Sequence, residues 1–438
     1  MTRGFVAAFY EAGLCCRRGT RKEADGVLVI PVFVPHAGCP NNCCFCNQKV
    51  ISGNLREPDM SEVAEEIEKY RRAAERYSHV QIAFFGGSFT AIPAERQEMY
   101  LETASRFLRK NGGFADEFRL STRPDAIDGE VIKRLRKYNA TVVELGAQSM
   151  DDSVLAKSGR GHKAKATEEA SRLLKEAGFV LGLQTMTGLP GAGEESDLET
   201  ARKIASIGPD FVRIYPTVVV RQTQLYRDYA EGRYVPATVE DAVRLCSGLC
   251  EIYAESGIRV VRMGLQATDT ITRNGERSEV AAGPYHEAFG QLVTSYDALE
   301  TVSDRICEIA ENKGKIRFGY LTLEVPSGRV SDMVGQRRAN VEALQERFGF
   351  SKVKVVTRGG GPAQGCFMDG AGQDSARFDS GSETPNAKTL RILNESFRNR
   401  LAWAVNEKTS ERVISGITGG NPGEIKVLNV TIGVEFRE

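Results

Sequence analysis

Several features are missing from this sequence, and each absence narrows the class of protein it can encode. The 438 residues carry 58 Lys and Arg against 58 Asp and Glu, so the overall charge indicates no partner and only local clusters can. No stretch approaches the roughly 20 apolar residues that a membrane helix needs, and the N-terminus lacks the pattern of a signal peptide. We therefore expect a cytoplasmic protein with no membrane partner.

Histidine is also scarce, with four residues in the chain. A lone histidine more often packs or forms a hydrogen bond than binds a metal, so His162 and His286 indicate no site by themselves. The length predicts about two or three domains, and an apolar content of 41% is enough for a sizeable core. The ten cysteines suit a reducing compartment.

The first two-thirds of the chain alternates between strand-like and helix-like runs. Asp59 with Glu62 predicts a capping box, and Thr238 with Asp241 predicts a second helix start. Gly178 predicts a helix end. Strict alternation of this kind predicts a parallel sheet covered by helices, either doubly wound or a complete or partial (β/α) barrel. The expected strands cover residues 27–34, 80–85, 117–121, 141–145, 179–184, 210–215 and 258–262.

Glycine and polar motifs follow one expected strand after another. In either architecture the active site forms at the carboxyl ends of the strands, so the shared location of these motifs indicates a site there. The motifs are Gly86-Gly87-Ser88-Phe89, Ser121-Thr122-Arg123-Pro124-Asp125, Glu144-Leu145-Gly146-Ala147-Gln148-Ser149, Gln184-Thr185-Met186-Thr187-Gly188-Leu189-Pro190-Gly191 and Arg213-Ile214-Tyr215-Pro216.

Three cysteines directly after the first expected strand are the most informative residues. Cys39, Cys43 and Cys46 have the spacing C-x3-C-x2-C, and cysteine thiolates are the usual ligands of iron–sulfur clusters. Three thiolates can hold three irons of a [4Fe–4S] cube and leave the fourth iron open to a substrate or cofactor. The spacing therefore predicts chemistry at a cluster rather than simple electron transfer.

Two other interpretations of these cysteines compete with the cluster. A structural zinc site needs four closed ligands, for which His36 would be the fourth, and no second Cys/His pair lies nearby. The length of the chain argues against a disulfide staple. Cys44 breaks the spacing, so we expect it to be a small packed side chain.

The glycine turn after the second strand is a candidate ligand site. Gly86 and Gly87 allow a ligand to approach the backbone, and Ser88 adds a hydroxyl group. The alternative is a strand-to-helix turn that simply needs glycine.

Three polar residues at the ends of later strands are further candidates for the cofactor site. Arg123, before Pro124, is a natural carboxylate clamp, and the alternative is a structural ion pair with Asp125. Gln148 suits a ribose or purine, and the alternative is a polar cap to the barrel. Gln184 ends the fifth strand.

A basic patch follows the fourth strand. The patch can be a solvent-exposed face, as most such runs of charged residues are, or a binding surface for an anionic substrate. Its members are Lys157, Arg160, His162, Lys163 and Lys165.

The pattern changes near residue 290, where a smaller α+β unit is expected to begin. Residues 313–358 hold ten Lys and Arg against four Asp and Glu, an excess of six. The turn Val334-Gly335-Gln336-Arg337-Arg338 resembles a degenerate KH domain, whose Gly-x-x-Gly loop clamps single-stranded backbone, with Arg338 in place of the second glycine. An ordinary helical hairpin is the alternative. The expected segments are 1–26, 27–290, 291–358, a flexible linker over 359–388, and 389–438.

These motifs together resemble the radical S-adenosylmethionine superfamily, through the three cysteines and Gly86-Gly87-Ser88-Phe89. Within it, the order of the strand-end motifs, together with Arg160-Gly161-His162, is similar to the catalytic subunit of Elongator over residues 27–290. No acetyl-CoA motif of an acetyltransferase domain is found after residue 290.

The resemblance implies a partial (β/α) barrel and a set of roles. Cys39, Cys43 and Cys46 would bind a [4Fe–4S] cluster, whose fourth iron would take the amino and carboxylate groups of S-adenosylmethionine. Gly86, Gly87 and Ser88 would line the methionine amine, with Gln148 and Gln184 near the adenosyl part. Reductive cleavage would yield a 5′-deoxyadenosyl radical that abstracts hydrogen from the substrate.

The sequence therefore predicts a radical S-adenosylmethionine enzyme that acts on tRNA or another RNA and receives electrons from a flavodoxin or ferredoxin. The RNA-binding candidates are Arg160, Lys163, Arg337 and Arg338. One alternative is a small-molecule enzyme like coproporphyrinogen oxidase relatives, although Gln184 stands where those carry an acidic residue. The other is a non-catalytic RNA-binding protein with a structural metal.

Overall fold

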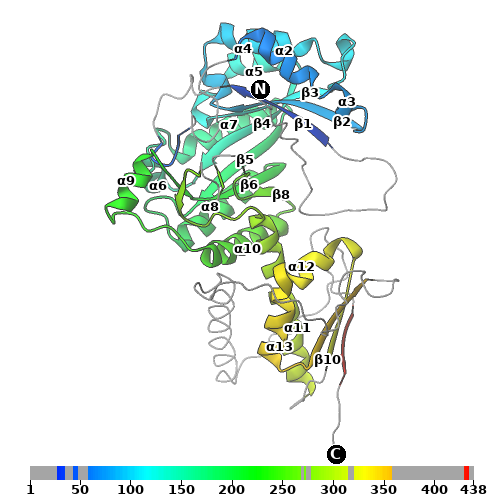
Figure 1. The fold of residues 1–438 in the computed structure, drawn as a ribbon. Helices are drawn as coiled ribbons and strands as arrows, with labels where there is room; N and C mark the ends of the chain where they lie inside the picture. The colour runs from blue at the N-terminus through cyan, green and yellow to red at the C-terminus, as the bar shows by residue number, and fades with distance from the viewer. Residues whose placement is uncertain are drawn as a thin grey trace, which may run out of the picture. The chain divides into compact units, whose positions relative to one another are not determined.

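The fold is taken from a computed structural model, which describes residues 27–34, 43–47, 58–267, 271–272, 278–313, 320–357 and 429–433. For residues 308–313, 320 and 429–433 the description is limited to the main chain. The chain divides into two compact units, residues 1–290 and 291–438 (Figure 1). Within the described segments, no helix is long and apolar enough to cross a membrane.

The first unit is built on a seven-stranded sheet in which every strand pairs in parallel with its neighbours. The strand order follows the chain, so the sheet is an open, curled partial barrel with β1 and β8 at its two edges (Figure 1). The fold class expected from the sequence is confirmed. The strands are β1 Val27–Val34, β2 His79–Gly86, β3 Glu117–Thr122, β4 Ala140–Gln148, β5 Val180–Thr187, β6 Phe211–Pro216 and β8 Arg259–Met263.

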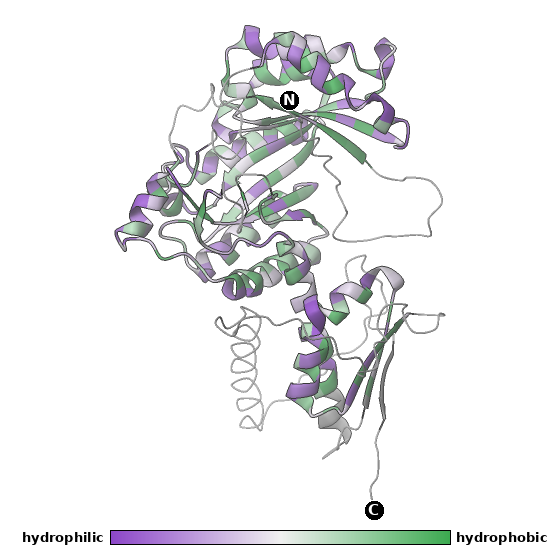
Figure 2. Cartoon of the chain, viewed as in Figure 1, coloured by the Kyte–Doolittle hydropathy of each residue, from purple (hydrophilic) through white to green (hydrophobic). Residues whose placement is uncertain are grey.

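Apolar side chains explain why these segments are strands. β1 and β2 are almost wholly buried, as expected of a parallel sheet covered by helices, and the strands are mostly apolar in Figure 2. The largest fully buried side chains of the sheet include Phe84, Phe118, Ile30, Ile82 and Leu120. These side chains form the hydrophobic core of the sheet, and their packing fixes the positions of the strand ends.

Helices connect the strands and begin at the expected caps. Asp59 and Glu62 form a capping box at the first of them, and Thr238 caps α10 through the Asp241 main-chain nitrogen. Gly178 has φ +77° directly after the cap of α7. The helices are α2 Met60–Glu68, α3 Arg71–Ala74, α4 Ala94–Ser105, α5 Gly129–Lys137, α6 Asp152–Lys157, α7 Ala164–Glu176, α8 Glu194–Ile207, α9 Gln224–Ala230 and α10 Val239–Glu255. A separate two-stranded antiparallel sheet pairs β7 Val219–Val220, which follows β6, with β9 Val280–Ala282, which follows β8.

The second unit is a three-stranded sheet with helices. β10 Tyr320–Val325 pairs in parallel with β11 Lys352–Thr357 and antiparallel with β12 Asn429–Gly433. Between β10 and β11 the chain forms α12 Val330–Val334, a turn and α13 Ala339–Phe348, as the sequence predicts. The long helix α11 Phe289–Lys313 supplies Leu299, Val302 and Ile306 to the same core.

Some expectations lie outside the described residues. These are the segment 1–26, the linker 359–388 and, apart from β12, the segment 389–438. Cys39 and His36 also lie outside them.

Candidate active site

The candidate site is built at the carboxyl end of the first sheet, where the described part of the cysteine loop is fixed by its neighbours. Cys46 N donates to Cys43 O over 3.1 Å, so the two cysteines stand on one tight turn. The main chain of Cys44 accepts from Leu225 N at 2.8 Å and donates to Ser158 O at 3.0 Å. Cys43 is buried, and Cys46 is half-buried. The turn is therefore held by segments more than 100 residues away in the sequence.

Cys44 is the packed side chain that the spacing predicts. It is 8% exposed and packs with Val219 and Leu225. Burial, together with the neighbouring Cys43, raises the pKa of the Cys44 thiol to about 12. Cys44 is accordingly a neutral packing group, unlike a metal-binding thiolate.

The glycine turn lies against the end of β1. Gly86 has φ +105°, and a Cβ atom there would come within 2.8 Å of Val34 O. Gly87 N donates to the same carbonyl oxygen over 2.9 Å. Phe89 anchors the far side of the turn, because its ring stacks on Phe84 with centroids 4.8 Å apart. Glycine is therefore required at position 86 by the backbone itself, while Ser88 is buried behind it.

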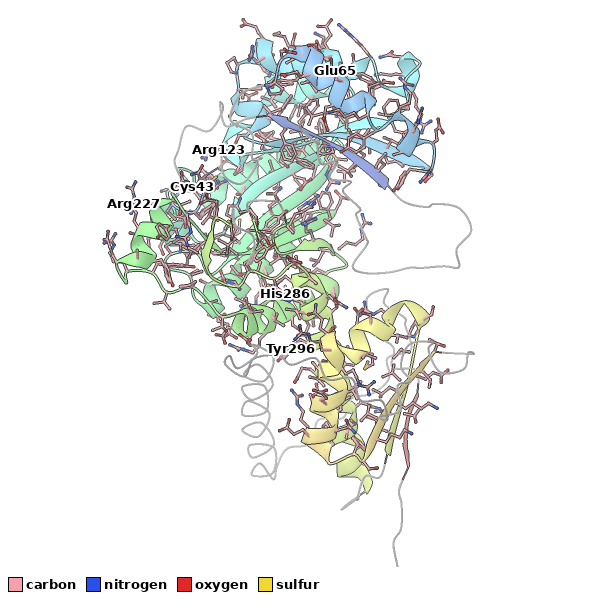
Figure 3. The ribbon with its side chains drawn as sticks, viewed as in Figure 1. Cys43, Glu65, Arg123, Arg227, His286 and Tyr296 are labelled. Carbon is pink, nitrogen blue, oxygen red and sulfur yellow. The ribbon has the colours of Figure 1, made fainter. Side chains whose placement is uncertain are left out.

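Arg123 lies at the same end of the sheet as Cys43 (Figure 3). Two of its nitrogens donate to the Asp125 carboxylate, each over 2.8 Å, and Nη2 also donates to Arg160 O over 2.6 Å. Burial alone would raise the pKa of Asp125, but this paired guanidinium holds it below its usual range. The ion pair that was the alternative to a carboxylate clamp is thus present, and it also fixes the segment around Arg160.

Arg160 departs from the expected basic patch. Its residue exposure is only 7%, whereas Lys157, Lys163 and Lys165 are exposed. Nη1 of Arg160 donates to Cys43 Sγ at 3.3 Å, and Nη2 donates to Gly146 O at 2.6 Å. Arg160 is therefore not part of a solvated basic face, because its guanidinium is engaged inside the protein.

His162 is also buried rather than part of a basic face. Nδ1 lies 3.2 Å from Lys163 O, which can only accept, so this nitrogen carries the hydrogen. Burial, helped by the charge of Arg160, lowers the pKa of His162 to about 4. The ring is therefore neutral at physiological pH.

Gln148 ends β4 in an unusual conformation. Its φ is +66°, next to a shift in the pairing of β4 with β5 between Gly146 and Gln148. Its Oε1 is buried and has no hydrogen-bond partner within the described residues. Buried polar atoms nearly always have partners, so an orphan acceptor at a strand end is what a ligand-binding side chain shows before its ligand binds.

A network of charged residues, which the sequence prediction missed, lies on the inner face of the sheet. Glu144 is fully buried, and its carboxylate binds Arg119 Nε at 2.5 Å and Arg213 Nε at 2.7 Å. Gln184 donates to the same carboxylate over 3.1 Å. Burial alone would raise the pKa of Glu144, but the two guanidiniums hold it below its usual range.

The sequence held a signal for this network. Arg119, Glu144 and Arg213 each stand between two apolar residues of β3, β4 and β6, and alternation places all three on the inner face. The structure extends β4 three residues beyond its expected end, so Glu144 lies inside the strand and not at its tip.

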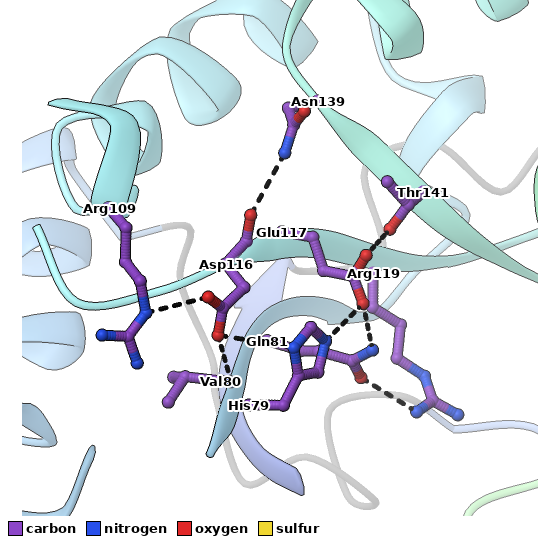
Figure 4. Close-up of polar contacts among 9 residues, drawn as sticks. All are labelled: His79, Val80, Gln81, Arg109, Asp116, Glu117, Arg119, Asn139 and Thr141. Atoms are coloured by element: carbon purple, nitrogen blue, oxygen red, sulfur yellow. Dashed lines mark hydrogen bonds and ion pairs between the residues drawn. The ribbon is translucent and has the colours of Figure 1, made fainter. Parts of the chain in front are cut away.

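Polar contacts continue toward the amino ends of the strands (Figure 4). Gln81 accepts from Arg119 Nη1 at 3.3 Å and donates to Glu117 over 2.6 Å. His79 Nε2 lies 2.8 Å from the same Glu117 oxygen. This end of the network lies away from the cysteines and joins β2 to β3 and β4.

The residues at the carboxyl end fit an iron–sulfur cluster and its cofactor. Cys43 and Cys46 stand on one turn, and Gly86 ends β2 at the same end of the sheet. Gln148 supplies an unused buried acceptor. Of the candidate residues, the structure gathers Gly86, Gly87, Ser88, Arg123, Gln148 and Arg160 near this end, with Gln184 deeper in the sheet.

Comparison with known proteins agrees with this architecture. Residues 33–204 match the family model described as the Radical SAM superfamily, and residues 209–299 match the Radical_SAM C-terminal domain. The tRNA uridine(34) acetyltransferase of Methanocaldococcus infernus is 26% identical over 318 residues, which cover 64% of this chain and 58% of that protein. Elongator complex protein 3 of Homo sapiens is 27% identical over 271 residues, which cover 51% of this chain and 49% of that protein.

The solved structure of the archaeal Methanocaldococcus infernus Elp3 shares the fold, with a TM-score of 0.50 and 22% identity over 64% of each chain. The chain thus spans about half to three-fifths of the length of these two curated relatives. Two consecutive domain matches and the partial barrel lead to the same assignment: residues 33–299 of this chain belong to the radical SAM superfamily, whose members use a [4Fe–4S] cluster and S-adenosylmethionine.

Proposed function

We propose that this chain is a radical S-adenosylmethionine enzyme that modifies tRNA or another RNA. The observation that carries the proposal is that Cys43 and Cys46 stand on one tight turn at the end of the sheet where the Gly86–Gly87 turn and the orphan acceptor of Gln148 also lie. When bound, the cluster and S-adenosylmethionine supply a 5′-deoxyadenosyl radical that removes a hydrogen atom from the substrate.

The chain's own residues take these roles in the proposal. Cys39, Cys43 and Cys46 bind the cluster. Gly86, Gly87 and Ser88 form the floor for the methionine part of the cofactor, and the packing of Gly86 and Gly87 against Val34 O fixes the main chain of this turn. Gln148 accepts a hydrogen bond from the adenosyl part through Oε1.

Two further residues complete the cofactor site. Arg123, oriented by Asp125, places a positive charge near the cofactor carboxylate. Gln184, held by Glu144, lies below the adenosyl part.

RNA is the substrate class that the relatives and the second unit favour. The curated relatives are named as a tRNA uridine(34) acetyltransferase and as a subunit of Elongator. In the second unit, Arg337 and Arg338 are exposed on the turn between α12 and α13, where main-chain N–H groups begin a helix. Lys163 is exposed on the first unit. A flavodoxin- or ferredoxin-type electron donor and a cytoplasmic location complete the proposal.

Anaerobic cluster analysis tests the chemistry. We expect about four iron and four sulfide per chain, and 5′-deoxyadenosine after addition of S-adenosylmethionine and dithionite. Cys43→Ala should lose the cluster and the product, whereas Cys44→Ala should keep both, because Cys44 is a packed thiol. The neighbouring pair is a matched control, since both substitutions remove one sulfur from the same turn.

Other outcomes would decide against the proposal. Zinc in place of iron, with no cleavage of S-adenosylmethionine, would assign the protein to RNA-binding proteins with a structural metal. A full cluster with cleavage, but no salt-sensitive retention of tRNA, would keep the radical chemistry and move the substrate to a small molecule.

A further inference from the structure

Arg160 contacts the sulfur of Cys43, although it takes no part in the proposed binding of the cofactor. Arg160 lies on the loop between α6 and α7, 117 residues after Cys43, and its Nη1 donates to Cys43 Sγ over 3.3 Å. The second terminal nitrogen, Nη2, donates to Gly146 O near the end of β4 over 2.6 Å. One guanidinium thus ties the cysteine turn to the sheet.

The loop is shaped to send this side chain inward. Gly159 and Gly161, on either side of Arg160, have φ +67° and +74°, a conformation that glycine adopts at little cost. Arg160 N donates to Leu155 O over 3.0 Å, and Arg160 O accepts from Arg123. The main chain of Arg160 is therefore fixed at both its nitrogen and its carbonyl oxygen, and its side chain is held inside the protein.

The glycine at position 146 permits the second contact. A Cβ atom there would lie 3.4 Å from Arg160 Nη2 and 3.1 Å from Gln148 Nε2. Gly146, the Gly-Arg-Gly loop and Cys43 together hold the Arg160 guanidinium in one position.

We propose that Arg160 is a positioning residue for the iron–sulfur cluster, which donates a charge-assisted hydrogen bond to the sulfur of Cys43 and raises the reduction potential of the cluster. The proposal rests on the proposed function. Hydrogen bonds to cluster sulfurs and local charge are established controls of potential. A donor with a positive charge stabilises the reduced cluster, which carries the extra electron, more than the oxidised one.

The test is a redox titration of the anaerobic, full-length protein without RNA, monitored by electron paramagnetic resonance. Arg160→Gln removes the positive charge and the pair of terminal nitrogens that donate to Cys43 Sγ and Gly146 O. Arg160→Lys keeps the charge, but its single nitrogen cannot reach both acceptors. Arg172→Gln is the matched control, because this arginine pairs with Glu176 on the exposed face of α7. Iron content and melting temperature are measured for each variant.

We expect a potential below that of the wild type for Arg160→Gln, a smaller shift for Arg160→Lys, and no shift for Arg172→Gln. Full clusters with an unchanged potential and unchanged spectrum in both Arg160 variants would overturn the proposal. Loss of the cluster at an unchanged melting temperature would support it, because only the position of Cys43 would then have failed. Loss of the fold in both variants would overturn it in favour of a purely structural arginine.

The iron content of the wild-type protein, measured before the variants, tests the proposed function separately. Wild-type protein that holds no iron contradicts that function, and with it this inference. Wild-type protein with a cluster confines any negative result to Arg160.

Discussion

At the scale of single residues, the most demanding group in the first unit is the carboxylate of Glu144. It has no solvent exposure, and it meets Arg119 from β3 and Arg213 from β6. A phenyl ring of Phe211 also lies under the Arg119 guanidinium, with its centroid 4.8 Å away. Burying three charges is costly unless they satisfy one another, so each member depends on the others.

Glu144→Gln should destabilise the protein by about 3 kcal/mol, because two buried guanidiniums would lose their common carboxylate. Denaturation in urea measures the change in the free energy of unfolding. Glu199→Gln is the matched control, since Glu199 pairs with Arg202 on an exposed helix face and should change stability by less than about 0.5 kcal/mol. Equal effects of the two substitutions would show that the buried network contributes no more than a surface pair.

At the scale of elements, the connection between β5 and α8 depends on one buried acid. Asp197, in the first turn of α8, is 4% exposed and accepts a hydrogen bond from Gly188 N over 2.9 Å. Burial raises the pKa of Asp197 to about 7 from an ordinary value of 3.8. The Gly-Leu-Pro-Gly turn after β5 is thus held by a carboxyl group that changes charge close to neutral pH.

This raised pKa makes stability depend on pH. A group whose folded pKa is raised stabilises the fold fully below its unfolded pKa, and the contribution is lost as pH rises through the folded value. Between pH 4 and 7 the wild type should therefore lose stability relative to Asp197→Asn, which keeps an acceptor for Gly188 N and cannot ionise. Melting temperatures of the two proteins measured across this range give the difference.

Asp151→Asn provides a control of opposite sign. The Val154 and Ser153 main-chain nitrogens at the start of α6 hold the pKa of Asp151 below its usual value. Its contribution is present above the unfolded pKa and is lost as pH falls through the folded one. A constant gap between Asp197→Asn and the wild type at all pH values would contradict the raised pKa.

The sequence predicts elements better than it predicts what lies between them. All seven strands of the first sheet, the capping box at Asp59 and the helix pair of the second unit were predicted, because periodicity and caps are local properties. The inward turn of Arg160 was not, because it depends on Gly146 and Cys43, which are distant in the sequence. The long β4 was also missed, since its last residues pair only with β5 and the register of that pairing shifts between Gly146 and Gln148.

The same limit applies to the candidate site. The positions of Gly86 and Gln148 at strand ends follow from the alternation of strands and helices. The φ of +66° at Gln148 does not, because nothing in the sequence around a glutamine indicates a left-handed residue. Likewise, no local pattern says that Arg119, Glu144 and Arg213 meet, although each is a charged residue between two apolar neighbours of its strand.

At the scale of the whole molecule, the chain places its candidate cluster ligands and its basic turn in different compact units. In the second unit, Arg337 and Arg338 have φ +51° and +68°, in the region that glycine favours. Both side chains are exposed, and Arg338 caps α13 without a side-chain hydrogen bond. Left-handed residues cost roughly 1 kcal/mol each when they are not glycine. Because the two adjacent arginines are exposed and lower the stability of the turn, their positive charge is the property that accounts for their presence there.

The separation into two units yields a prediction about RNA. Replacing both residues, Arg337→Ala with Arg338→Ala, should weaken tRNA binding and lower the slope of log affinity against log salt by about 2, one for each lost phosphate contact. Formation of 5′-deoxyadenosine without RNA should stay unchanged, because Cys43 and Gln148 lie in the other unit.

Filter-binding titrations at several salt concentrations measure the slope. A second double variant, Arg305→Ala with Lys352→Ala, is the control, because it removes the same charge from exposed positions on α11 and β11 of the same unit. If both double variants lower the slope equally, tRNA responds only to the net charge of the unit, and the turn is an ordinary helical hairpin. A loss confined to the turn variant would instead make the turn a phosphate clamp, in which arginine charge replaces the close backbone approach that a second glycine would give.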